Sequence, residues 1–513
     1  MKTFKWILLL ILSGNFFNLS AQQIGDLDST FNLNGKVITD FGGGGDGANS
    51  VLIQPDGKIL VAGYSSSGTN YTFALSRYNT NGSLDISFGG TGKVVTDFAP
   101  GYDYAGCIAL QPDGKIVAAG VKYSNPSYDN ALIRYNIDGS LDSTFGTNGK
   151  VTNPVGTADG GINSIAIQPD GKIIAVGGST TFTTGHDYAV SRYNVDGTLD
   201  NTFGTGGITL TDFSNSYDFP FSVCLQSDGK IVVGGSTGPD PLYDFGVVRY
   251  DTLGNVDTTF GTNGFVVTDF GKPDEWANAS IIQGDGKIIL AGYSGSPYKF
   301  ALARYNDDGT LDTTFNSTGK VLTTIGTHVE ANAVALEPGG KIVVAGVTYN
   351  GSNQNFCIAR YLANGTPDNT FGTTGFVTTD FGTNGDKAKG VAIQADGQIV
   401  VAGVSGNDFA VARYLVVLST GIIDFATMNN SVFIYPNPVT QNATLTYSLK
   451  QAEKISIRLT DARGRMVKTF IENQMQTASD HQQIISFPDN LPHGTYFIVI
   501  ANTTEHLNIK IVK

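Results

Sequence analysis

The sequence predicts an all-β protein, with a seven-bladed β-propeller closed by an N-terminal strand and followed by a small C-terminal β-sandwich. Three observations lead to this prediction. One turn motif occurs seven times, a second motif recurs every 55 to 58 residues, and each period contains four short strand-like segments separated by turn residues. Four short strands per repeat are typical of a propeller blade, so seven repeats predict seven blades.

Each repeat is organised around one hairpin, exemplified by IAIQPDGKIIAVGG at residues 165–178. Pro169 presets the first turn position, Asp170 bonds back to its own backbone, and Gly171 takes the left-handed conformation. The flanking segments are β-branched and apolar on both faces, which predicts two strands covered on both sides. The turn motif begins at residues 54, 111, 168, 226, 283, 337 and 394.

The other two strands of each repeat carry their own motifs. A third strand ends in Arg-Tyr, and a block of the form LDxTFGxxGKVxTDF supplies the fourth strand. The first copy of that block, at residues 27–41, has no preceding three strands, and the last repeat ends after its third strand, at Tyr414. Pairing the orphan strand with the last three would close the ring and remove both exposed edges.

The chain has four predicted parts. Lys2 and Lys5 precede a short apolar run at residues 6–12, which predicts a secretory signal peptide over residues 1–21 and not a membrane anchor. The propeller is expected over residues 22–415 and a linker over residues 416–431. Alternating apolar residues predict the β-sandwich over residues 432–513. No later segment is apolar enough to predict a transmembrane span.

Two parts of the chain resemble known families. The LDxTFG…DGKIVVAG…ARYN pattern of residues 27–414 resembles the delta-60 repeat, whose members are propeller-like and have no established biochemical activity. Residues 432–513 are similar to the C-terminal sorting domain of the type IX secretion system of Bacteroidetes. The matching motifs are Tyr435-Pro436-Asn437-Pro438, Asp461-Ala462-Arg463-Gly464-Arg465, Gly494-Thr495-Tyr496 and the basic end at Lys510 and Lys513. The second resemblance implies a partner, the type IX machinery, and a secreted or cell-surface location.

The charge of the chain limits its partners. The formal net charge is −13, although only 15% of the residues are charged. An acidic body argues against nucleic acid as a ligand, whereas cations, basic proteins and neutral polyhydroxyl compounds remain open. We expect a monomer without a cofactor, except that a structural or mouth-bound cation such as calcium fits the acidic composition.

Common catalytic signatures are missing from the sequence. His186 and His328 have no partner at metal-binding spacing, and no GxSxG or P-loop motif occurs. The most regular charges are one Arg and one Asp per repeat, which predict a repeated scaffold bridge. These residues are Arg77, Arg134, Arg192, Arg249, Arg304, Arg360 and Arg413, with Asp28, Asp85, Asp142, Asp200, Asp257, Asp312 and Asp368.

A second acidic set precedes the first strand of each repeat and is the candidate binding site. In a propeller these loops surround one mouth of the central channel, so the carboxylates would form a negative funnel for a cation or a basic group. The alternative is that each carboxylate caps its own loop backbone. The set comprises Asp46, Asp103, Asp159, Asp218, Glu275, Glu330 and Asp386.

Aromatic residues accompany these acids. Tyr64, Tyr123 and Tyr293 lie in loops between the second and third strands, and Trp276 lies beside Glu275. Aromatic rings next to carboxylates suit sugars, whose C–H faces stack while their hydroxyls bond to the acids. The alternative is that the rings pack the loops onto the blades.

Three functions remain open at this point. The favoured one is a non-enzymatic, secreted or cell-surface propeller that binds a glycan or a protein through loops at one mouth. The second is a polysaccharide lyase or glycoside hydrolase that uses carboxylates there, although the sequence offers no singular acid pair. The third is a purely structural surface or matrix protein.

Overall fold

The computed structural model describes residues 23–513, except for 69, 99–100, 124–126, 156–159, 182–184, 214–216, 352, 373, 383–384, 417–432, 436–440, 449–451, 462–464, 478, 489–490, 493 and 502–505. The chain divides into two compact units, Met1–Val416 and Val417–Lys513. The predicted signal peptide and nearly all of the predicted linker lie outside the described residues. Across the described part of the chain, no helix has the length and apolarity needed to span a bilayer.

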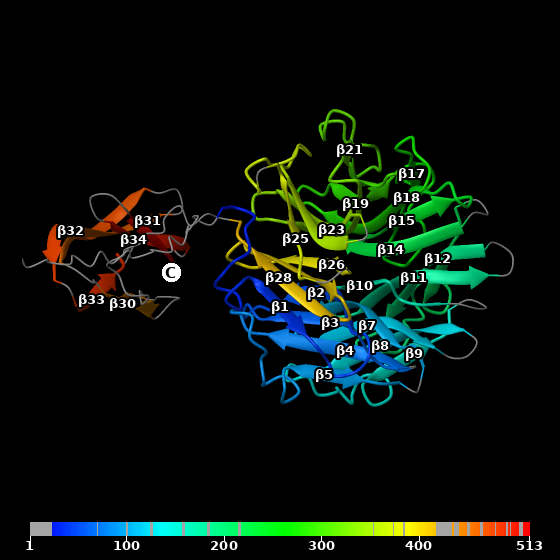
Figure 1. Ribbon diagram of the computed structural model, residues 1–513, viewed down its shortest axis with the longest axis horizontal. Coiled ribbons are helices and arrows are strands. Elements are labelled where there is room, and N and C mark those ends of the chain that lie inside the picture. Colours follow the sequence, from blue (N-terminus) through cyan, green and yellow to red (C-terminus); the bar gives the residue numbers. More distant parts are fainter. Residues whose placement is uncertain are drawn as a thin grey trace, which may run out of the picture. The chain divides into compact units, whose positions relative to one another are not determined.

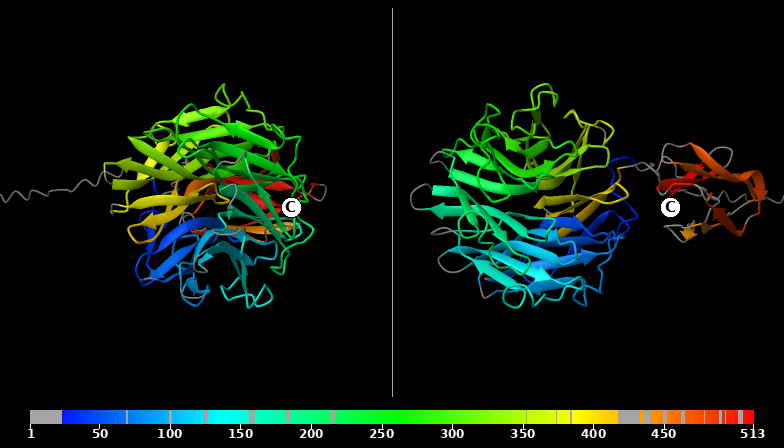
Figure 2. Two further views of the ribbon diagram at one scale, coloured as in Figure 1. Left: turned by 90° about the vertical axis from the view of Figure 1, so that its right-hand side faces the viewer. Right: turned by 180° about the vertical axis from the view of Figure 1, so that it is seen from behind.

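The larger unit consists of seven four-stranded antiparallel sheets that follow one another in chain order around an axis (Figures 1 and 2). The first three are β2 (Gly47–Ile53), β3 (Ile59–Ser67), β4 (Asn70–Tyr78), β5 (Lys93–Thr96); β6 (Tyr104–Leu110), β7 (Ile116–Tyr123), β8 (Tyr128–Tyr135), β9 (Lys150–Asn153); and β10 (Ser164–Ile167), β11 (Ile173–Thr181), β12 (Gly185–Tyr193), β13 (Ile208–Thr211).

Three further sheets repeat this order. They are β14 (Tyr217–Leu225), β15 (Ile231–Gly238), β16 (Asp244–Tyr250), β17 (Phe265–Thr268); β18 (Glu275–Ile282), β19 (Ile288–Ser294), β20 (Lys299–Tyr305), β21 (Lys320–Thr323); and β22 (His328–Leu336), β23 (Ile342–Asn350), β24 (Asn353–Tyr361), β25 (Phe376–Thr379).

The seventh sheet joins the two ends of the unit. It contains β26 (Asp386–Ile393), β27 (Ile399–Ser405), β28 (Asp408–Tyr414) and, at its outer edge, β1 (Lys36–Thr39). The register runs from Lys36 opposite Ala412 to Thr39 opposite Phe409, and blue β1 lies against yellow β28 in Figure 1. The predicted seven-bladed propeller closed by an N-terminal strand is therefore confirmed.

The inner strands β2, β6, β10, β14, β18, β22 and β26 each contact the inner strand of the next blade. We call the end of the propeller where these strands begin the entry end. The opposite end, which carries the seven hairpin turns, is the turn end. Each turn closes as predicted; in the first, the Gly57 N–H donates to the Gln54 carbonyl at 2.9 Å and the Gln54 N–H to the Lys58 carbonyl at 2.8 Å.

One glycine in the second strand of every blade allows the inner strand to approach closely. A Cβ at Gly63 would lie 1.9 Å from the Gly47 carbonyl oxygen, and one at Gly292 would lie 1.7 Å from the Trp276 carbonyl oxygen. Such distances exclude any side chain at these positions. The glycine of the repeated VAG motif thus sets where each inner strand starts.

The predicted Arg–Asp pairs exist in all seven blades. Arg134 Nε lies 2.7 Å from Asp142 Oδ2 and Arg192 Nε lies 2.8 Å from Asp200 Oδ2, with both partners buried. In the blade that closes the ring, Arg413 donates to Asp28, which is 385 positions away in sequence. Burial alone would raise the pKa of Asp142, but hydrogen bonds from Thr144 and Lys115 and the Arg134 charge hold that pKa well below its usual range.

Within the described part of the propeller, six of these Arg side chains, all but Arg360, also have a hydrogen bond to a carbonyl of the next blade. Arg192 Nη1 donates to the Thr252 carbonyl of the next blade at 2.6 Å, and the Arg192 guanidinium stacks on Phe203, 4.7 Å from the ring centre. Equivalent bonds run from Arg249 to the Asp307 carbonyl and, across the closure, from Arg413 to the Thr80 carbonyl, both at 2.5 Å. We call this repeated Arg–Asp–Phe set the turn-end belt.

The C-terminal unit is a β-sandwich, as predicted. One sheet has the order β29 (Phe433–Tyr435), β30 (Asn442–Ser448), β33 (Asp480–Ser486), and the other has the order β32 (Met466–Gln476), β31 (Glu453–Asp461), β34 (Thr495–Ala501), β35 (His506–Val512). Apolar residues from both sheets, among them Leu445, Ile457, Ile485 and Ile498, form one core. The alternation of apolar residues seen in the sequence corresponds to this inward face.

We predict that Arg192→Leu lowers the free energy of unfolding by about 3–5 kcal/mol, because it leaves the buried Asp200 carboxylate without its main partner. Urea unfolding monitored by circular dichroism measures the effect. The matched control is Lys172→Met, which removes a partly exposed partner of the same carboxylate and should cost only about 1 kcal/mol. Equal losses in the two variants would contradict the role of the belt.

Candidate functional site

Five of the predicted acids lie in the interior of the propeller. Asp46, Asp103, Asp218, Glu275 and Asp386 are at most 1% exposed. The expectation that they form an open negative funnel is therefore wrong for these five, because a buried carboxylate presents no charge at an opening. Asp159 lies outside the described residues.

Four of these carboxylates bond to the backbone just upstream, whereas Asp103 accepts from the Tyr123 N–H at 2.9 Å. Asp46 accepts from the Phe41 N–H and Asp386 from the Phe381 N–H, each at 2.7 Å, and Asp218 accepts from the Phe213 N–H at the same distance. The alternative considered from the sequence, in which each acid caps its own loop, therefore describes this set. The acids fix the connection that leads from the outer strand of one blade to the inner strand of the next.

Glu330 differs from the other acids because it is one position out of register. Ala331 pairs with Gly346 as Ala277 pairs with Gly292, so that Val329 occupies the position of Glu275, and Glu330 that of Trp276. Since side chains alternate along a strand, Glu330 points to the opposite face. Its side chain is 24% exposed.

Among the residues that the structure describes, three blade junctions gather three carboxylates each, with oxygen atoms within 4.8 Å of one another. Each group combines the start of a third strand, the end of a fourth strand and the start of the next inner strand. Oxygen-only groups of this kind have the ligand chemistry that calcium prefers, and the expected cation stays a prediction. The groups are Asp40, Asp46 and Asp408; Asp187, Asp212 and Asp218; and Asp244, Asp269 and Glu275.

The titration of Glu275 is strongly perturbed. Burial raises the pKa of Glu275 to about 7, and Asp244 adds to this shift, whereas hydrogen bonds from the Phe270 and Lys272 N–H groups and from the Ser294 hydroxyl act in the opposite direction. A carboxyl that keeps its proton near neutral pH contributes little negative charge to the entry end.

The variable positions of the entry end directly follow a buried acid in five of the seven blades. They are identified by one contact, since each of their carbonyl oxygens packs against the invariant glycine of its blade. Five of these positions carry side chains, which differ strongly from blade to blade, and the other two are glycines, while the strand that holds them changes little. We call these positions the entry ring: Gly47, Tyr104, Gly161, Phe219, Trp276, Glu330 and Lys387.

Trp276 is the centre of an aromatic cluster in the entry ring. The Trp276 ring lies 5.3 Å from Phe219, 5.7 Å from Phe221 and 5.0 Å from Tyr243. Its Nε1 donates to Asp274 Oδ1 at 2.5 Å, and Tyr298 OH donates to the other oxygen of Asp274. Asp274 has a φ of +63°, an unfavourable value for a residue with a side chain.

A second group of rings continues from Tyr298. Tyr293 and Tyr298 lie 4.6 Å apart, Tyr298 and His328 4.4 Å, and His328 and Tyr349 4.5 Å between ring centres. His328 Nε2 lies 2.9 Å from Glu330 Oε1, and Tyr349 OH donates to the same oxygen at 3.2 Å. Burial, and then Asp274, raise the pKa of the Tyr298 phenol to about 12.

The predicted residues Tyr64 and Tyr123 belong to a separate row in the first two blades. Successive ring centres along Tyr64, Tyr71, Tyr102, Tyr123 and Tyr128 are 5.4, 5.3, 6.1 and 5.2 Å apart. The Tyr64 ring covers Gly47, where a Cβ would lie 2.7 Å from the phenol carbon. The entry end is therefore lined by rings from several blades.

Phe219, Asp274 and Lys387 were not among the predicted site residues. For Phe219 and Lys387 the signal was present in the sequence, because aligning the repeats on Ala48, Ala277 and the equivalent residues places the variable position directly before them. The prediction followed the acids instead, whose regular recurrence reflects scaffolding.

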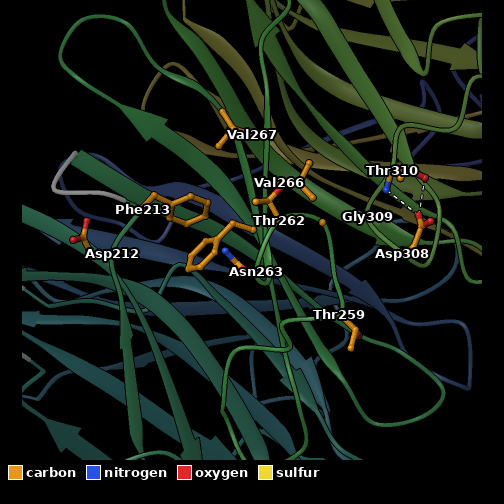
Figure 3. A pocket seen from close by; sticks show the side chains of 12 residues that line it. Asp212, Phe213, Thr259, Thr262, Asn263, Val266, Val267, Asp308, Gly309 and Thr310 are labelled. Atoms are coloured by element: carbon orange, nitrogen blue, oxygen red, sulfur yellow. Dashed lines mark hydrogen bonds between the residues drawn. The ribbon is translucent and has the colours of Figure 1, made fainter.

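A groove of 930 Å³ lies away from the entry ring, at the outer strands (Figure 3). Phe213, Val266 and Thr262 line it, and Thr310 donates to Asp308 Oδ1 at its edge. A groove of 570 Å³ occurs at the equivalent place two blades earlier, lined by Phe98, Val151 and Thr147. Its recurrence marks it as a product of the repeat.

Family models match both units of the chain. A β-propeller domain of unknown function, DUF5122, matches residues 54–88, 111–145, 168–203, 226–260, 283–315, 338–371 and 394–416. A secretion system C-terminal sorting domain matches residues 433–513. The chain is a DUF5122 β-propeller protein with a secretion system sorting domain. This confirms the predicted family and the predicted export to the cell surface or the extracellular space.

Several solved structures are similar to the chain at low sequence identity. PorZ, a surface component of the type IX secretion system of Porphyromonas gingivalis, is 11% identical with a TM-score of 0.38, covering 90% of this chain and 59% of PorZ. A PL25 ulvan lyase is 13% identical with a TM-score of 0.43, covering 74% and 96%. Sqt1 from Chaetomium thermophilum is 13% identical with a TM-score of 0.41, covering 73% and 97%. None of the curated proteins matches the chain.

We predict that, in the presence of a chelator, the free energy of unfolding falls as the pH rises from about 5 to about 8. This fall should be absent in Glu275→Gln. Folded Glu275 keeps its proton up to about pH 7, whereas an unfolded chain releases it near pH 4.3. Between these values the folded state binds more protons, so the free energy of unfolding falls as pH rises, by roughly 2–3 kcal/mol. Urea midpoints at both pH values measure the difference, and parallel changes in wild type and variant would contradict it.

Proposed function

We propose that this exported propeller binds an extracellular glycan through the entry ring and the aromatic loops around it. The observation that carries the proposal is the Trp276 cluster, in which Asp274 holds both the indole N–H of Trp276 and the phenol of Tyr298. Trp276, Phe219 and Tyr298 are all only partly buried.

The chemistry of the cluster suits a sugar. Aromatic faces stack on the C–H faces of pyranose rings, and carboxylates accept hydrogen bonds from sugar hydroxyls. Asp274 and Glu330 supply such oxygens next to Trp276 and Tyr349. The rings are held by hydrogen bonds before any ligand arrives, which reduces the entropy lost on binding.

The scaffold supports the same assignment. Loops on a rigid frame are where binding residues vary, and the entry ring changes from aromatic to acidic to basic among Trp276, Glu330 and Lys387. The turn end repeats its Arg, Asp and Phe in every blade and offers no comparable variation.

A second candidate is an extracellular polysaccharide lyase or glycoside hydrolase, favoured by the His328–Glu330–Tyr349 contacts. A histidine and a tyrosine that share one carboxylate oxygen could act as general base and acid. Release of oligosaccharides that stops in His328→Asn but leaves binding intact would favour this candidate over binding alone.

We predict that Trp276→Ala weakens glycan binding at least tenfold, about 1.4 kcal/mol, because it removes the largest stacking surface of the cluster. Once the predicted signal peptide is removed, Trp276 is the single tryptophan of the chain. Ligand titrations of the wild type can therefore be followed by its fluorescence, and those of the variant by calorimetry.

The matched control is Leu253→Ala, an exposed apolar residue at the turn end. Its affinity should equal that of the wild type. Equal losses in both variants, or no binding by any member of a broad panel of neutral and charged glycans, would reject the proposed function.

A further inference from the structure

Two lysines of the entry end differ from most lysines of the propeller, whose side chains bond to carboxylates or backbone carbonyls. Lys387 and Lys389 lie on the inner strand β26 and are half-buried. Within the described ranges, the side-chain ammonium group of neither lysine has an ion-pair or hydrogen-bond partner. Burial, and then the charge of Lys387, lower the pKa of Lys389, while Glu330 acts in the opposite direction.

Other lysines of the propeller are tied to the scaffold. At the turn end, Lys115 lies 2.9 Å from Asp142 Oδ2, and Lys287 lies 2.6 Å from Asp312 Oδ2. On the outer strands, Lys93 and Lys320 donate to backbone carbonyls of the preceding blade at 2.9 and 2.8 Å. Among the described lysines of the propeller, Lys272 and Lys299 also lack a side-chain partner, so the lysines of β26 are distinguished by lying two residues apart on one inner strand without one.

Lys389 also replaces a residue that has a structural task elsewhere. In four blades the same place holds Asn49, Asn163, Asn278 or Asn332, whose side-chain amide donates at 2.8 Å to a carbonyl of the next inner strand. In β26 the register shifts between Ala388 and Gly390, so Lys389 is the extra residue of a β-bulge, as Asn278 is in β18. In this blade a lysine therefore replaces the asparagine, and the interblade hydrogen bond of the asparagine amide is absent.

We propose that Lys387 and Lys389 form a subsite for an anionic substituent, a carboxylate or a sulfate ester, on the glycan bound at the entry end. This inference rests on the proposed function and specifies its ligand. Two half-buried like charges without a directly bonded counter-ion are costly, and an anionic group of the ligand would supply that contact. Lys387 follows Trp276 and Glu330 in the entry ring, so the subsite lies next to the aromatic surface.

The charge of the whole molecule restricts the ligand further. A net charge of −13 repels densely charged polymers such as nucleic acid. A sugar chain with separated anionic groups keeps its stacking contacts and needs cations only at one place. Lys387 and Lys389 provide cations at one such place, between the His328–Tyr349 rings and the Tyr64 row.

The test uses the full secreted chain and pairs of oligosaccharides that differ only in charge. One pair is hexagalacturonate and its methyl ester, and the other is a sulfated carrageenan hexasaccharide and its desulfated form. We expect one anionic member to bind at least tenfold more tightly than its neutral partner, and this preference to shrink as the salt concentration rises. The pair that shows the preference identifies carboxylate or sulfate as the group.

Lys389→Asn is the most informative variant, because it restores the residue of the four other blades. We expect this variant to fold with equal or greater stability, through a new bond to the Ala48 carbonyl. The double variant Lys387→Gln/Lys389→Asn should lose the preference for the anionic ligand. Affinity for the neutral member should stay unchanged. The control Lys230→Gln removes the same charge at the turn end and should retain the preference.

The outcomes separate the two proposals. Equal binding of charged and neutral members, or a preference that survives in the Lys387→Gln/Lys389→Asn double variant, overturns the anionic subsite and leaves glycan binding standing. A lower stability of Lys389→Asn assigns Lys389 to the scaffold and also overturns the subsite. Failure of every glycan to bind overturns both proposals.

Discussion

The propeller depends on one repeated interaction, the buried Arg–Asp pair of the turn-end belt. Each pair fastens the outer part of its own blade, and its guanidinium stacks on a phenylalanine. In six blades the same guanidinium also donates to a carbonyl of the next blade, as with Arg192, Asp200, Thr252 and Phe203. Because the last pair joins Arg413 to Asp28, the belt also holds the two ends of the ring together. A buried pair of this kind tolerates few substitutions, since removing one partner leaves the other charge buried and unpaired.

This constraint divides the molecule into two ends with different freedom. The turn end carries the belt and the hairpin turns, which must recur in every blade. At the entry end the buried acids hold the connections, while the entry-ring position is partly exposed and varies, as Phe219, Trp276, Glu330 and Lys387 show. Regular recurrence therefore indicates scaffold, and departures from it, such as Lys389 in the place of asparagine, indicate function.

Much of the fold followed from the sequence because its determinants are local and repeated. Turn chemistry at residues such as Pro169 and Gly171, and the incomplete first and last repeats, were sufficient to predict seven blades and the closing strand. The candidate site was predicted less well. Glu330 was grouped with Asp46 and Glu275 by spacing alone, although a shift of one residue turns a strand side chain to the other face. Burial of the five acids depends on the neighbouring blade, which no single repeat reveals.

The most direct measurement is photo-crosslinking of a bound oligosaccharide, with the modified peptides identified by mass spectrometry. The structure predicts adducts at the entry end, within residues 272–278, 328–332 and 386–390. Adducts concentrated at the hairpin turns or in the outer groove at residues 259–267 would contradict the division of the propeller into a scaffold end and a binding end.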